Sequence, residues 1–431
     1  MNKPAVSFFW FRRDLRLEDN VGLFYALESN YPVIPLFIFD EDILDSLDKD
    51  DSRVGFIHES ISKINADLKN IGCSLLVKKG GTKAVWQNLL EEYDIQEVFY
   101  NKDYEPYAIQ RDNAISNFLD ENNVASHSFK DQVIFEELEI TKADGLPYTI
   151  YTPYKNKWLE NYKDLGGFHK YSTEDQFSNF YKAIFNFPSL QEIGFEESVI
   201  KVKPHNLSQI ASYHETRDFP ALNTTSYLSP HLRFGTVSVR KLVTWAAKTN
   251  AVFLSELIWR EFFMQILFSF PKVVSHNFKA AYDGIQWRNN EEDFKRWCSG
   301  TTGYPMVDAG MRELNATGYM HNRVRMVVAS FLCKHLLIQW QWGEAYFAEK
   351  LLDYDLSANV GNWQWAAGTG CDAAPYFRVF NPEIQLKKFD GKGIYIRKWI
   401  PEFDLDYVEP MVDHAFARDR AIATYKAGIL K

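Results

Sequence analysis

Short apolar runs alternate with amphipathic stretches over residues 1–130 of the chain. Runs of strand length, such as VSFFWF and VIPLFIF, are followed by stretches with apolar residues three and four positions apart, such as VGFIHESISKINADLKNIG. This alternation is typical of a parallel sheet, because each parallel strand needs a long crossover, usually a helix, to reach the next. The pattern predicts an α/β domain over residues 1–130 with a five-stranded, Rossmann-like parallel sheet.

The pattern changes after residue 130. Residues 131–204 contain prolines and aromatic residues with weak periodicity, which predicts a connector that runs along the surface. From residue 205 to residue 431, stretches such as FLSELIWREFFMQILFS and YPMVDAGMRELNATG have helical spacing and are separated by glycine or proline. We therefore predict an all-helical domain over residues 205–431.

One of the helical stretches, ANVGNWQWAAGTG, holds two tryptophans two positions apart. Side chains at i and i+2 leave a helix on nearly opposite sides, whereas those at i and i+4 share a face. Trp363 therefore shares a face with Asn359, and Trp365 points the other way. The stretch is expected to form a wall between two compartments, with one indole on each side.

Composition and charge exclude several classes of protein. The net charge of −9 argues against a protein that coats nucleic acid by bulk attraction, although a local basic groove stays compatible with it. No apolar run is long enough to cross a membrane and no signal peptide is recognisable, so we expect a cytoplasmic protein without membrane contact. We also expect it to be a monomer. The four cysteines lack the spacing of a disulfide framework or a metal site. The 12 tryptophans indicate a large flat ligand, an aromatic core or both.

Hydroxyl groups cluster in TTSYLSPHLRFG, residues 224–235, directly before a predicted helix. Hydroxyls and free backbone N–H groups at a helix start can hold a phosphate, although ordinary N-capping explains most such clusters. The Gly80-Gly81 pair is not a dinucleotide fingerprint, which argues against a standard Rossmann cofactor site.

A second group of candidates lies in ELIWREFF. Glu256, Trp259 and Arg260 share one helical face by their spacing, and an ion pair between the glutamate and the arginine is the ordinary explanation. No Ser-His-Asp, Cys-His or metal-binding set accompanies this face. Any chemistry would therefore have to come from a bound cofactor.

A third group lies in HNRVRM. Asn322, Arg325 and Met326 form a stripe that runs from polar to apolar, which is ordinarily the edge of a core. If Arg325 is buried, it needs a carboxylate partner. Asp353 and Asp355 are both candidates for that partner.

Several blocks are long and distinctive: FWFRRDLRLEDN, TSYLS, ELIWREFF, WCSGTTGYPMVDAGMRELNATGYMHNRVRM and NWQWAAGTGCDAAPYFRVFNP. Together they span nearly the whole chain, which resembles class I cyclobutane pyrimidine dimer photolyases of the photolyase and cryptochrome superfamily. The resemblance implies an antenna domain, and a helical domain that binds FAD, reduced in its active form. It also implies light-driven repair of UV-damaged DNA, in which excited FADH⁻ gives an electron to a pyrimidine dimer flipped out of the duplex. The enzyme would be associated with the bacterial nucleoid when bound to DNA.

The resemblance also assigns roles around FAD. Asn359 would face flavin N5, where an amide can form a hydrogen bond without imposing a charge. Arg325 and Asp353 would form a salt bridge beside the flavin ring. The electron relay for photoreduction would run through Trp363, Trp340 and Trp287. The implied FAD contacts are Tyr213, Thr225, Ser226, Leu228, Ser229, Glu256, Arg260, Asn322, Arg325, Asp353, Asp355 and Asn359.

On the other side of the NWQW segment, the resemblance implies a cavity for the flipped dimer. Glu256 would form hydrogen bonds with the pyrimidine carbonyls, and Arg323 would hold a phosphate, with Lys387 and Lys388 on the rim. The implied catalytic residues are Glu256, Trp259, Asn322, Met326, Asn359 and Trp365. The implied DNA contacts are Trp259, Arg323, Trp365 and Lys387.

Other functions remain open. The (6-4) photolyases carry histidines in the lesion pocket where this chain has Asn322 and Met326. Cryptochrome photoreceptors of blue light usually add a long C-terminal extension, and little follows the region of resemblance here. A flavin-dependent dark oxidoreductase predicts a nicotinamide site, for which no fingerprint is present. We therefore favour repair of pyrimidine dimers, with a cryptochrome or a (6-4) photolyase as the alternatives.

The antenna chromophore is less well specified. Arg13, Asp103, Glu105 and Arg233 resemble the deazaflavin-type pattern, although a lysine is familiar at the last of these positions. Folate-type enzymes carry an Asn-Glu pair where this chain has Tyr107-Ala108. A deazaflavin is therefore favoured over folate, and a flavin mononucleotide or an empty pocket stays open.

Overall fold

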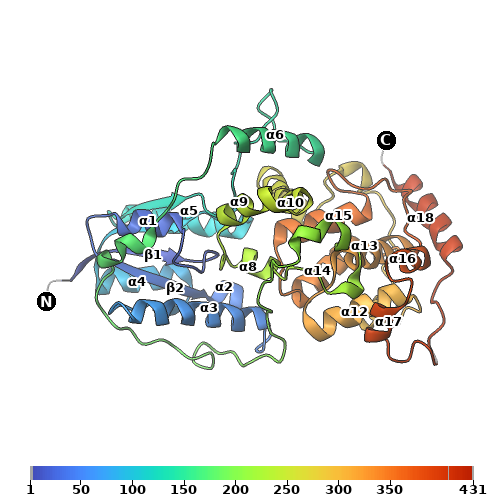
Figure 1. Ribbon diagram of the computed structural model, residues 1–431, viewed down its shortest axis with the longest axis horizontal. Coiled ribbons are helices and arrows are strands. Elements are labelled where there is room, and N and C mark those ends of the chain that lie inside the picture. The colour runs from blue at the N-terminus through green and yellow to red at the C-terminus, as the bar shows by residue number, and fades with distance from the viewer. Residues whose placement is uncertain (1–2, 406, 430–431) are drawn as a thin grey trace. The chain divides into compact units, whose positions relative to one another are not determined.

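The computed structural model describes residues 3–405 and 407–429, which form two compact units (Figure 1). The first unit comprises Met1–Glu136, Glu160–Pro204 and Leu228–Trp245, and the second comprises Glu137–Leu159, His205–Tyr227 and Ala246–Lys431. The predicted connector, residues 131–204, is divided between the two units. It contains the α-helix Tyr151–Asp164, which its weak periodicity did not predict. The predicted domain limits of 1–130, 131–204 and 205–431 stay predictions about which parts of the chain fold independently.

The first unit is built on a parallel five-stranded sheet, which confirms the predicted fold class. The strand order is β3-β2-β1-β4-β5, so that β1 lies in the centre, and Phe8 of β1 pairs with Ile34 of β2 and with Val98 of β4. The central strands are almost wholly buried, because both faces of the sheet are covered. The strands are β1 (Ala5–Phe11), β2 (Val33–Asp40), β3 (Leu76–Gly80), β4 (Asp94–Asn101) and β5 (Ala125–Phe129).

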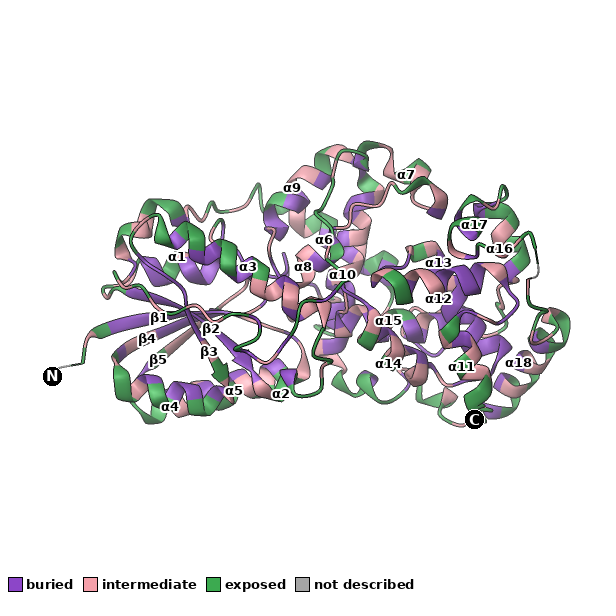
Figure 2. Ribbon diagram, turned by 90° about the horizontal axis from the view of Figure 1, so that it is seen from below, coloured by how far each residue is buried: buried purple, intermediate pink, exposed green. Residues whose placement is uncertain are grey.

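Helices cover both faces of this sheet (Figure 2). Phe9 and Phe11 belong to the core shared with α1 and α3, whereas Phe8 and Trp10 belong to the core shared with α4 and α5. Successive residues of β1 thus serve opposite faces. The elements of this part of the chain are α1 (Val21–Leu27), α2 (Glu41–Leu44), α3 (Ser52–Lys69), α4 (Thr82–Glu92), α5 (Pro106–Glu121), η1 (Thr173–Asn179), α8 (Ser229–Arg233) and α9 (Val239–Thr249).

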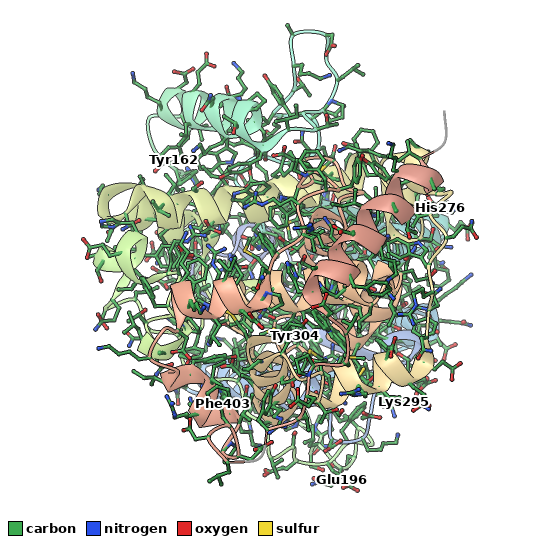
Figure 3. The ribbon with its side chains drawn as sticks, turned by 90° about the vertical axis from the view of Figure 1, so that its right-hand side faces the viewer. Tyr162, Glu196, His276, Lys295, Tyr304 and Phe403 are labelled. Carbon is green, nitrogen blue, oxygen red and sulfur yellow. The ribbon has the colours of Figure 1, made fainter. Side chains whose placement is uncertain are left out.

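The second unit is helical, as predicted, and side chains fill the space between its helices (Figure 3). Tyr304, labelled in that view, donates its hydroxyl hydrogen to Val412 O at 2.6 Å. The principal helices are α6 (Tyr151–Asp164), α7 (Tyr213–Thr216), α10 (Ala251–Ser269), α11 (Glu291–Ser299), α12 (Pro305–Thr317), α13 (Asn322–Ser330), α14 (Trp340–Lys350), α15 (Leu356–Ala367), α16 (Pro382–Phe389), α17 (Ile394–Trp399) and α18 (His414–Gly428). Shorter turns are η2 (Ile210–Ser212), η3 (Pro220–Leu222), η4 (Pro271–Val274), η5 (Ala280–Tyr282) and the π-turn η6 (Phe331–His335).

Helix α15 contains the NWQW segment and has well-defined ends. At its start, the carboxylate of Asp355 accepts a hydrogen bond from the N–H of Ala358, an N-cap that satisfies one free donor. At its end, Gly368 has φ +90°, the left-handed conformation that favours glycine at this position. Asn359, Trp363 and Trp365 therefore lie on one continuous helix.

Two further properties bear on the predictions from sequence. Among residues 3–405 and 407–429, no helix is both long enough and apolar enough to cross a lipid bilayer. The cysteines Cys73, Cys298, Cys333 and Cys371 are free thiols. Burial raises the pKa of the Cys333 thiol to about 12, which disfavours its reactive thiolate form.

Candidate functional site

The two tryptophans of α15 have different environments. Trp363 is only 2% exposed, and its ring lies 6.1 Å from that of Trp297 and 5.0 Å from that of Phe347. Gly343 on α14 permits this packing, since a Cβ atom there would lie 2.1 Å from the Trp363 ring. Trp365 is partly exposed. The two indoles thus differ in burial, and Trp365 also packs against the core cluster that contains Trp363. That they face two separate compartments stays a prediction.

Asn359 is held by a glutamate of α14. Its Nδ2 donates to the backbone oxygen of Glu344 at 3.1 Å and to the Glu344 Oε1 at 2.8 Å. Burial raises the pKa of Glu344, and the hydrogen bond from Asn359 opposes that rise. Both amide hydrogens are thus engaged, and Asn359 Oδ1 accepts no hydrogen bond from the residues that the structure describes. Glu344 was not predicted from the sequence, because helical periodicity does not show which residues of two different helices come into contact.

Arg325 on α13 forms a salt bridge with Asp353. Its Nη2 lies 3.2 and 3.0 Å from the two carboxylate oxygens, and its Nε donates to Met320 O at 2.8 Å. Of the two candidate partners, the structure therefore selects Asp353. Asp355 instead caps α15 and accepts a hydrogen bond from the Ser357 hydroxyl. The pairing is confirmed, and its role beside a flavin stays a prediction.

Glu256 on α10 pairs with an arginine that the sequence reasoning missed. Arg217 Nη1 donates to Glu256 Oε1 at 2.6 Å, so Glu256 does not form the expected ion pair with Arg260 within the helix. The guanidinium group of Arg217 also lies 5.3 Å from the centre of the Tyr213 ring. Burial, with a further contribution from the Glu256 carboxylate, raises the pKa of Tyr213 to about 12. Tyr213, a predicted FAD contact, and Glu256, a predicted contact of the lesion, thus both lie beside Arg217.

Arg323 lies in a second cationic cluster. Its Nη2 donates to Asp218 Oδ1 at 2.6 Å, and its Nη1 lies 3.6 Å from the Met326 sulfur. The Arg323 guanidinium group lies 4.3 Å from the centre of the Phe389 ring on α16, and the Nζ atom of Lys388 lies 5.1 Å from the same centre. The structure therefore brings a predicted DNA contact of α13 together with the basic end of α16.

The remaining two relay tryptophans belong to the same unit. Trp340 is 1% exposed, and its Nε1 donates to Asn277 Oδ1 at 2.9 Å. Trp287 is partly buried and lies edge-on to Tyr425 at 5.7 Å. Both pack in or against the cluster that contains Trp363, which places all three indoles in one aromatic region. Electron transfer between them stays a prediction.

The predicted phosphate-binding segment has no regular secondary structure before α8. Thr225 and Ser226 are half-buried, Leu228 is buried and Ser229 is the first residue of α8. The hydroxyl of Thr225 makes no hydrogen bond to any other residue within 3–405 and 407–429. Among the other predicted site residues, Trp259 and Arg260 are partly buried on α10, whereas Asn322 and Lys387 are exposed.

The four antenna candidates form one ion-pair network in the first unit. Arg13 Nη1 lies 3.1 Å from Asp103 and 2.9 Å from Glu105, and Arg233 Nη1 lies 2.6 Å from Glu105. The Arg13 Nε donates to Arg233 O at 3.1 Å. Burial alone would raise the pKa of Asp103, but the Arg13 and Arg233 charges bring it below its usual range. The four residues are therefore together, with their charges largely satisfied by one another.

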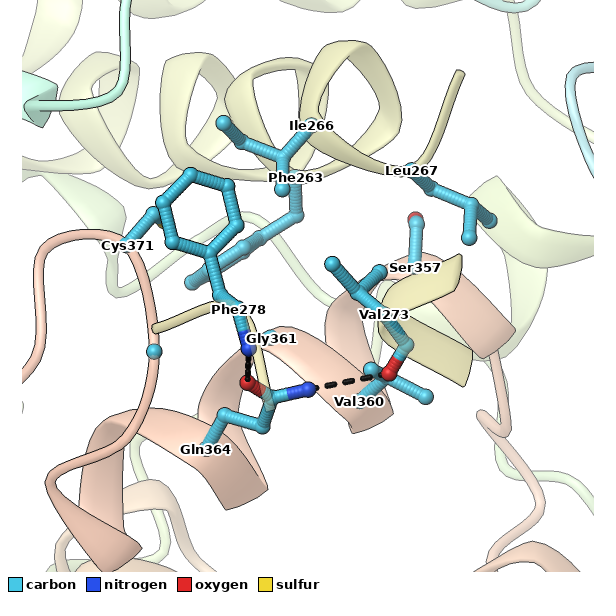
Figure 4. Close-up of a pocket in the computed structure, with 11 residues that line it drawn as sticks. Phe263, Ile266, Leu267, Val273, Phe278, Ser357, Val360, Gly361, Gln364 and Cys371 are labelled. Carbon is cyan, nitrogen blue, oxygen red and sulfur yellow. Dashed lines mark hydrogen bonds between the residues drawn. The ribbon is translucent and has the colours of Figure 1, made fainter. Parts of the chain in front are cut away.

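A small pocket lies between α10 and α15 (Figure 4). Gln364 closes one side of it, because its side chain accepts a hydrogen bond from Phe278 N and donates to Val273 O. The lining residues are Phe263, Ile266, Leu267, Val273, Phe278, Ser357, Val360, Gly361, Gln364, Gly370 and Cys371. Its lining is mostly apolar and includes none of the residues predicted from the sequence.

The residues present fit FAD in the chemistry of their polar groups. FAD presents an N–H or a nitrogen acceptor at N5 and a charged pyrophosphate. Asn359 Oδ1 is an acceptor without a partner among the described residues, and the Thr225 hydroxyl is a donor without one. The Arg325 guanidinium is fixed by Asp353 and is 27% exposed at its side chain. These groups match a ligand that combines a flavin with phosphates.

Two family models match the chain. The model described as "DNA photolyase" matches residues 7–173, and the model described as "FAD binding domain of DNA photolyase" matches residues 253–405. A deoxyribodipyrimidine photo-lyase of Agrobacterium fabrum is 34% identical, with 99% of this chain and 98% of the relative covered.

Two solved structures are also similar over nearly the full length. A bacterial class III photolyase from Agrobacterium tumefaciens has a TM-score of 0.83 at 33% identity, with 99% of this chain and 98% of the other covered. An archaeal photolyase from Sulfolobus tokodaii, described with two FAD molecules, has a TM-score of 0.80 at 33% identity, with 98% and 99% covered. The fold and the matched FAD-binding domain define a flavin-dependent enzyme. The chain belongs to the DNA photolyase family.

Proposed function

We propose that this chain repairs cyclobutane pyrimidine dimers in UV-damaged DNA, with light as the energy source. The observation that carries the proposal is the continuous helix α15, on which Asn359 and Trp363 are buried and Trp365, two residues after Trp363, is partly exposed. Gly361 lets α15 approach Phe263 of α10, since a Cβ atom there would lie 2.2 Å from that ring. Close packing of these two helices fixes Glu256 and Trp259 relative to the α15 wall.

The flavin side would hold and protect the cofactor. When bound and reduced, FAD supplies one electron to the dimer after absorbing light and regains it once the cyclobutane ring has opened. Asn359, with its amide hydrogens engaged by Glu344, offers a carbonyl oxygen that accepts a hydrogen bond from a protonated N5. This arrangement supports retention of the reduced cofactor. Hydroxyl groups of Thr225 and Ser226 would hold the phosphates.

The lesion side would recognise a dimer flipped from the duplex. The indole of Trp365 and the thioether of Met326 offer apolar surface to the fused pyrimidine rings, which cost less to unstack than an intact pair. Arg217 holds Glu256 at 2.6 Å and has further N–H groups to offer to pyrimidine carbonyls or to phosphate. Arg323 and Lys387 would contact the DNA backbone.

Class I stays our prediction, and one similar structure is described as class III. We favour a deazaflavin-type antenna held near Arg13, Asp103, Glu105 and Arg233. The two FAD molecules of the Sulfolobus tokodaii structure make a second flavin the main alternative. One chain supplies every residue of the proposed site, which supports action as a monomer, and the substrate places that action at DNA in the cytoplasm.

Lesion-specific repair is the direct test. Purified protein with reduced FAD is mixed with oligonucleotides that carry either a cyclobutane thymine dimer or a (6-4) photoproduct, in blue light and in darkness. We expect restored thymines only from the cyclobutane dimer and only in light. Repair of the (6-4) lesion instead would assign the chain to that activity, and light-induced conformational change without any repair would favour a photoreceptor.

A further inference from the structure

Tyr151, the first residue of α6, stacks on a predicted wall of the lesion cavity. Its ring centre lies 3.5 Å from that of Trp259, with the two planes 9° apart, and Tyr151 is only 6% exposed. The ring of Phe263 lies 5.4 Å from Trp259 at an angle of 27°. Trp259 therefore has two nearly parallel neighbouring rings, and Phe262 lies edge-on to it at 5.6 Å, which together restrict the tilt of its indole.

Hydrogen bonds fix Tyr151 in this position. Its hydroxyl lies 2.7 Å from Ser255 O, to which it donates, and 2.6 Å from Ser255 Oγ. Ser255 precedes Trp259 by four residues on α10 and so lies on the same face of the helix. The ring of Tyr151 is thus secured at its hydroxyl end to the helix whose indole it covers, and it cannot slide along that indole without breaking these contacts.

The backbone of Tyr151 makes a second connection, to the chain after α15. Its N–H donates to Asp372 Oδ2 at 3.1 Å, a favourable contact between a carboxylate and the start of a helix. Asp372 follows Trp365 by seven residues. One residue therefore contacts Trp259 with its ring and, with its backbone, the segment that extends from the second indole wall.

We propose that Tyr151 is a positioning residue for lesion recognition, which sets the orientation of Trp259 and its spacing from the segment after Trp365. This inference rests on the proposed function. Undamaged DNA would be held mainly through its phosphates, by groups such as Arg323 and Lys387. A flipped dimer would depend in addition on the placement of the indoles. Tyr151 therefore governs the preference for damaged over undamaged DNA.

The test measures dark binding of the FAD-loaded protein to a duplex with one thymine dimer and to the same duplex without it. Because an aromatic stack contributes about 0.5–1.5 kcal/mol, Tyr151→Leu should lower the ratio of the two affinities roughly 3- to 10-fold. Tyr151→Phe keeps the ring and should retain most of the preference. The matched control is Tyr154→Leu, one turn further along α6, where the tyrosine is 1% exposed and packs on Phe262 at 5.2 Å.

The outcomes separate this inference from the function on which it rests. If wild type prefers the dimer-containing duplex and Tyr151→Leu prefers it equally, the positioning role of Tyr151 is overturned. The same holds if Tyr154→Leu loses as much of this preference as Tyr151→Leu. Neither result affects the proposed repair function. A wild type without preference for the dimer overturns both. If Tyr151→Leu does not fold with FAD, the double variant Tyr151→Phe with Asp372→Ala removes both the hydroxyl contact with Ser255 and the acceptor of the Tyr151 N–H, and it keeps the ring. A loss of about 2- to 3-fold in preference is then expected, and an unchanged preference contradicts the proposal.

Discussion

Polar groups at the two candidate sites are satisfied in different ways. In the first unit, Arg13, Asp103, Glu105 and Arg233 form ion pairs with one another at distances of 2.6 to 3.1 Å. In the second unit, Asn359 uses its N–H groups within the protein and keeps its carbonyl oxygen without a partner among the described residues. A closed network stabilises the fold, whereas an oriented group with spare capacity is available to a ligand. Substitutions in the two regions should therefore affect different properties.

The largest effect is expected from Arg325→Leu in the second unit. It leaves Asp353, whose side chain is 8% exposed, without its partner, and it removes the cation proposed to lie beside the flavin. We expect FAD affinity to fall roughly 30- to 100-fold, equivalent to about 2–3 kcal/mol. The measurement is FAD retained after dialysis against increasing volumes of buffer.

A matched control is available in the same unit. Arg312→Leu removes an arginine that pairs at 2.6 Å with Glu402, whose side chain is 41% exposed against 8% for Asp353. Pairs of that kind contribute about 0–1 kcal/mol, so FAD retention should stay close to that of wild type. Equal loss of FAD from both variants would show that Arg325 acts only through general stability.

Asn359→Ala should produce the next largest effect, on the lifetime of reduced FAD. The variant lacks the amide oxygen that would accept a hydrogen bond from a protonated N5, so oxidation by air in darkness should be about tenfold faster. Absorbance of the flavin follows the reaction directly. Asn362→Ala is the control, because Asn362 lies on the same helix, is exposed and donates only to Ala358 O. The same acceleration in both variants would exclude a specific role for Asn359.

Asp103→Asn should have the smallest effect, and it should be on stability. Burial opposes ionisation of Asp103, but the arginines bring its pKa below its usual range. A carboxylate with a lowered folded pKa stabilises the fold fully above its unfolded pKa of about 3.9 and loses that contribution as the pH falls towards the folded value. We expect a loss of about 1 kcal/mol at neutral pH, with the difference from wild type shrinking below about pH 4.

Urea unfolding at a series of pH values measures this stability. Asp120→Asn, at an exposed position on α5, is the control and should unfold like wild type across the series. A difference between wild type and Asp103→Asn that is constant with pH would contradict the account of the network. FAD retention should be unchanged in both variants, because neither residue belongs to the second unit.

The sequence predicted the elements well, because those depend on local periodicity. The five parallel strands, the helical second unit and the single helix through Asn359, Trp363 and Trp365 are all present. The stretch HNRVRMVVASFLCKHLLIQWQWGEAYFAEKLLD, predicted only as helical, contains the π-turn η6 and Leu337 at φ +51°. Such a break depends on packing rather than on spacing.

Contacts between distant residues were harder to predict. Charge alone left Asp353 and Asp355 open as partners of Arg325, whereas the resemblance implied Asp353, and the structure confirms that pair. Arg217 was missed because it follows the short helix α7, and Tyr151 because it begins α6 in a stretch of weak periodicity. Their importance is evident only from their contacts with Glu256 and Trp259. The resemblance supplied the candidate residues, and the structure supplied the groups that hold them.

The central claim is that α15 separates a flavin side from a lesion side. Trp363→Phe and Trp365→Ala, each loaded with FAD, test it most directly when photoreduction of the flavin and repair by chemically reduced enzyme are measured on the same preparations. We predict that Trp363→Phe loses photoreduction and keeps repair, and that Trp365→Ala keeps photoreduction and loses repair. Loss of the same activity in both variants would contradict the separation.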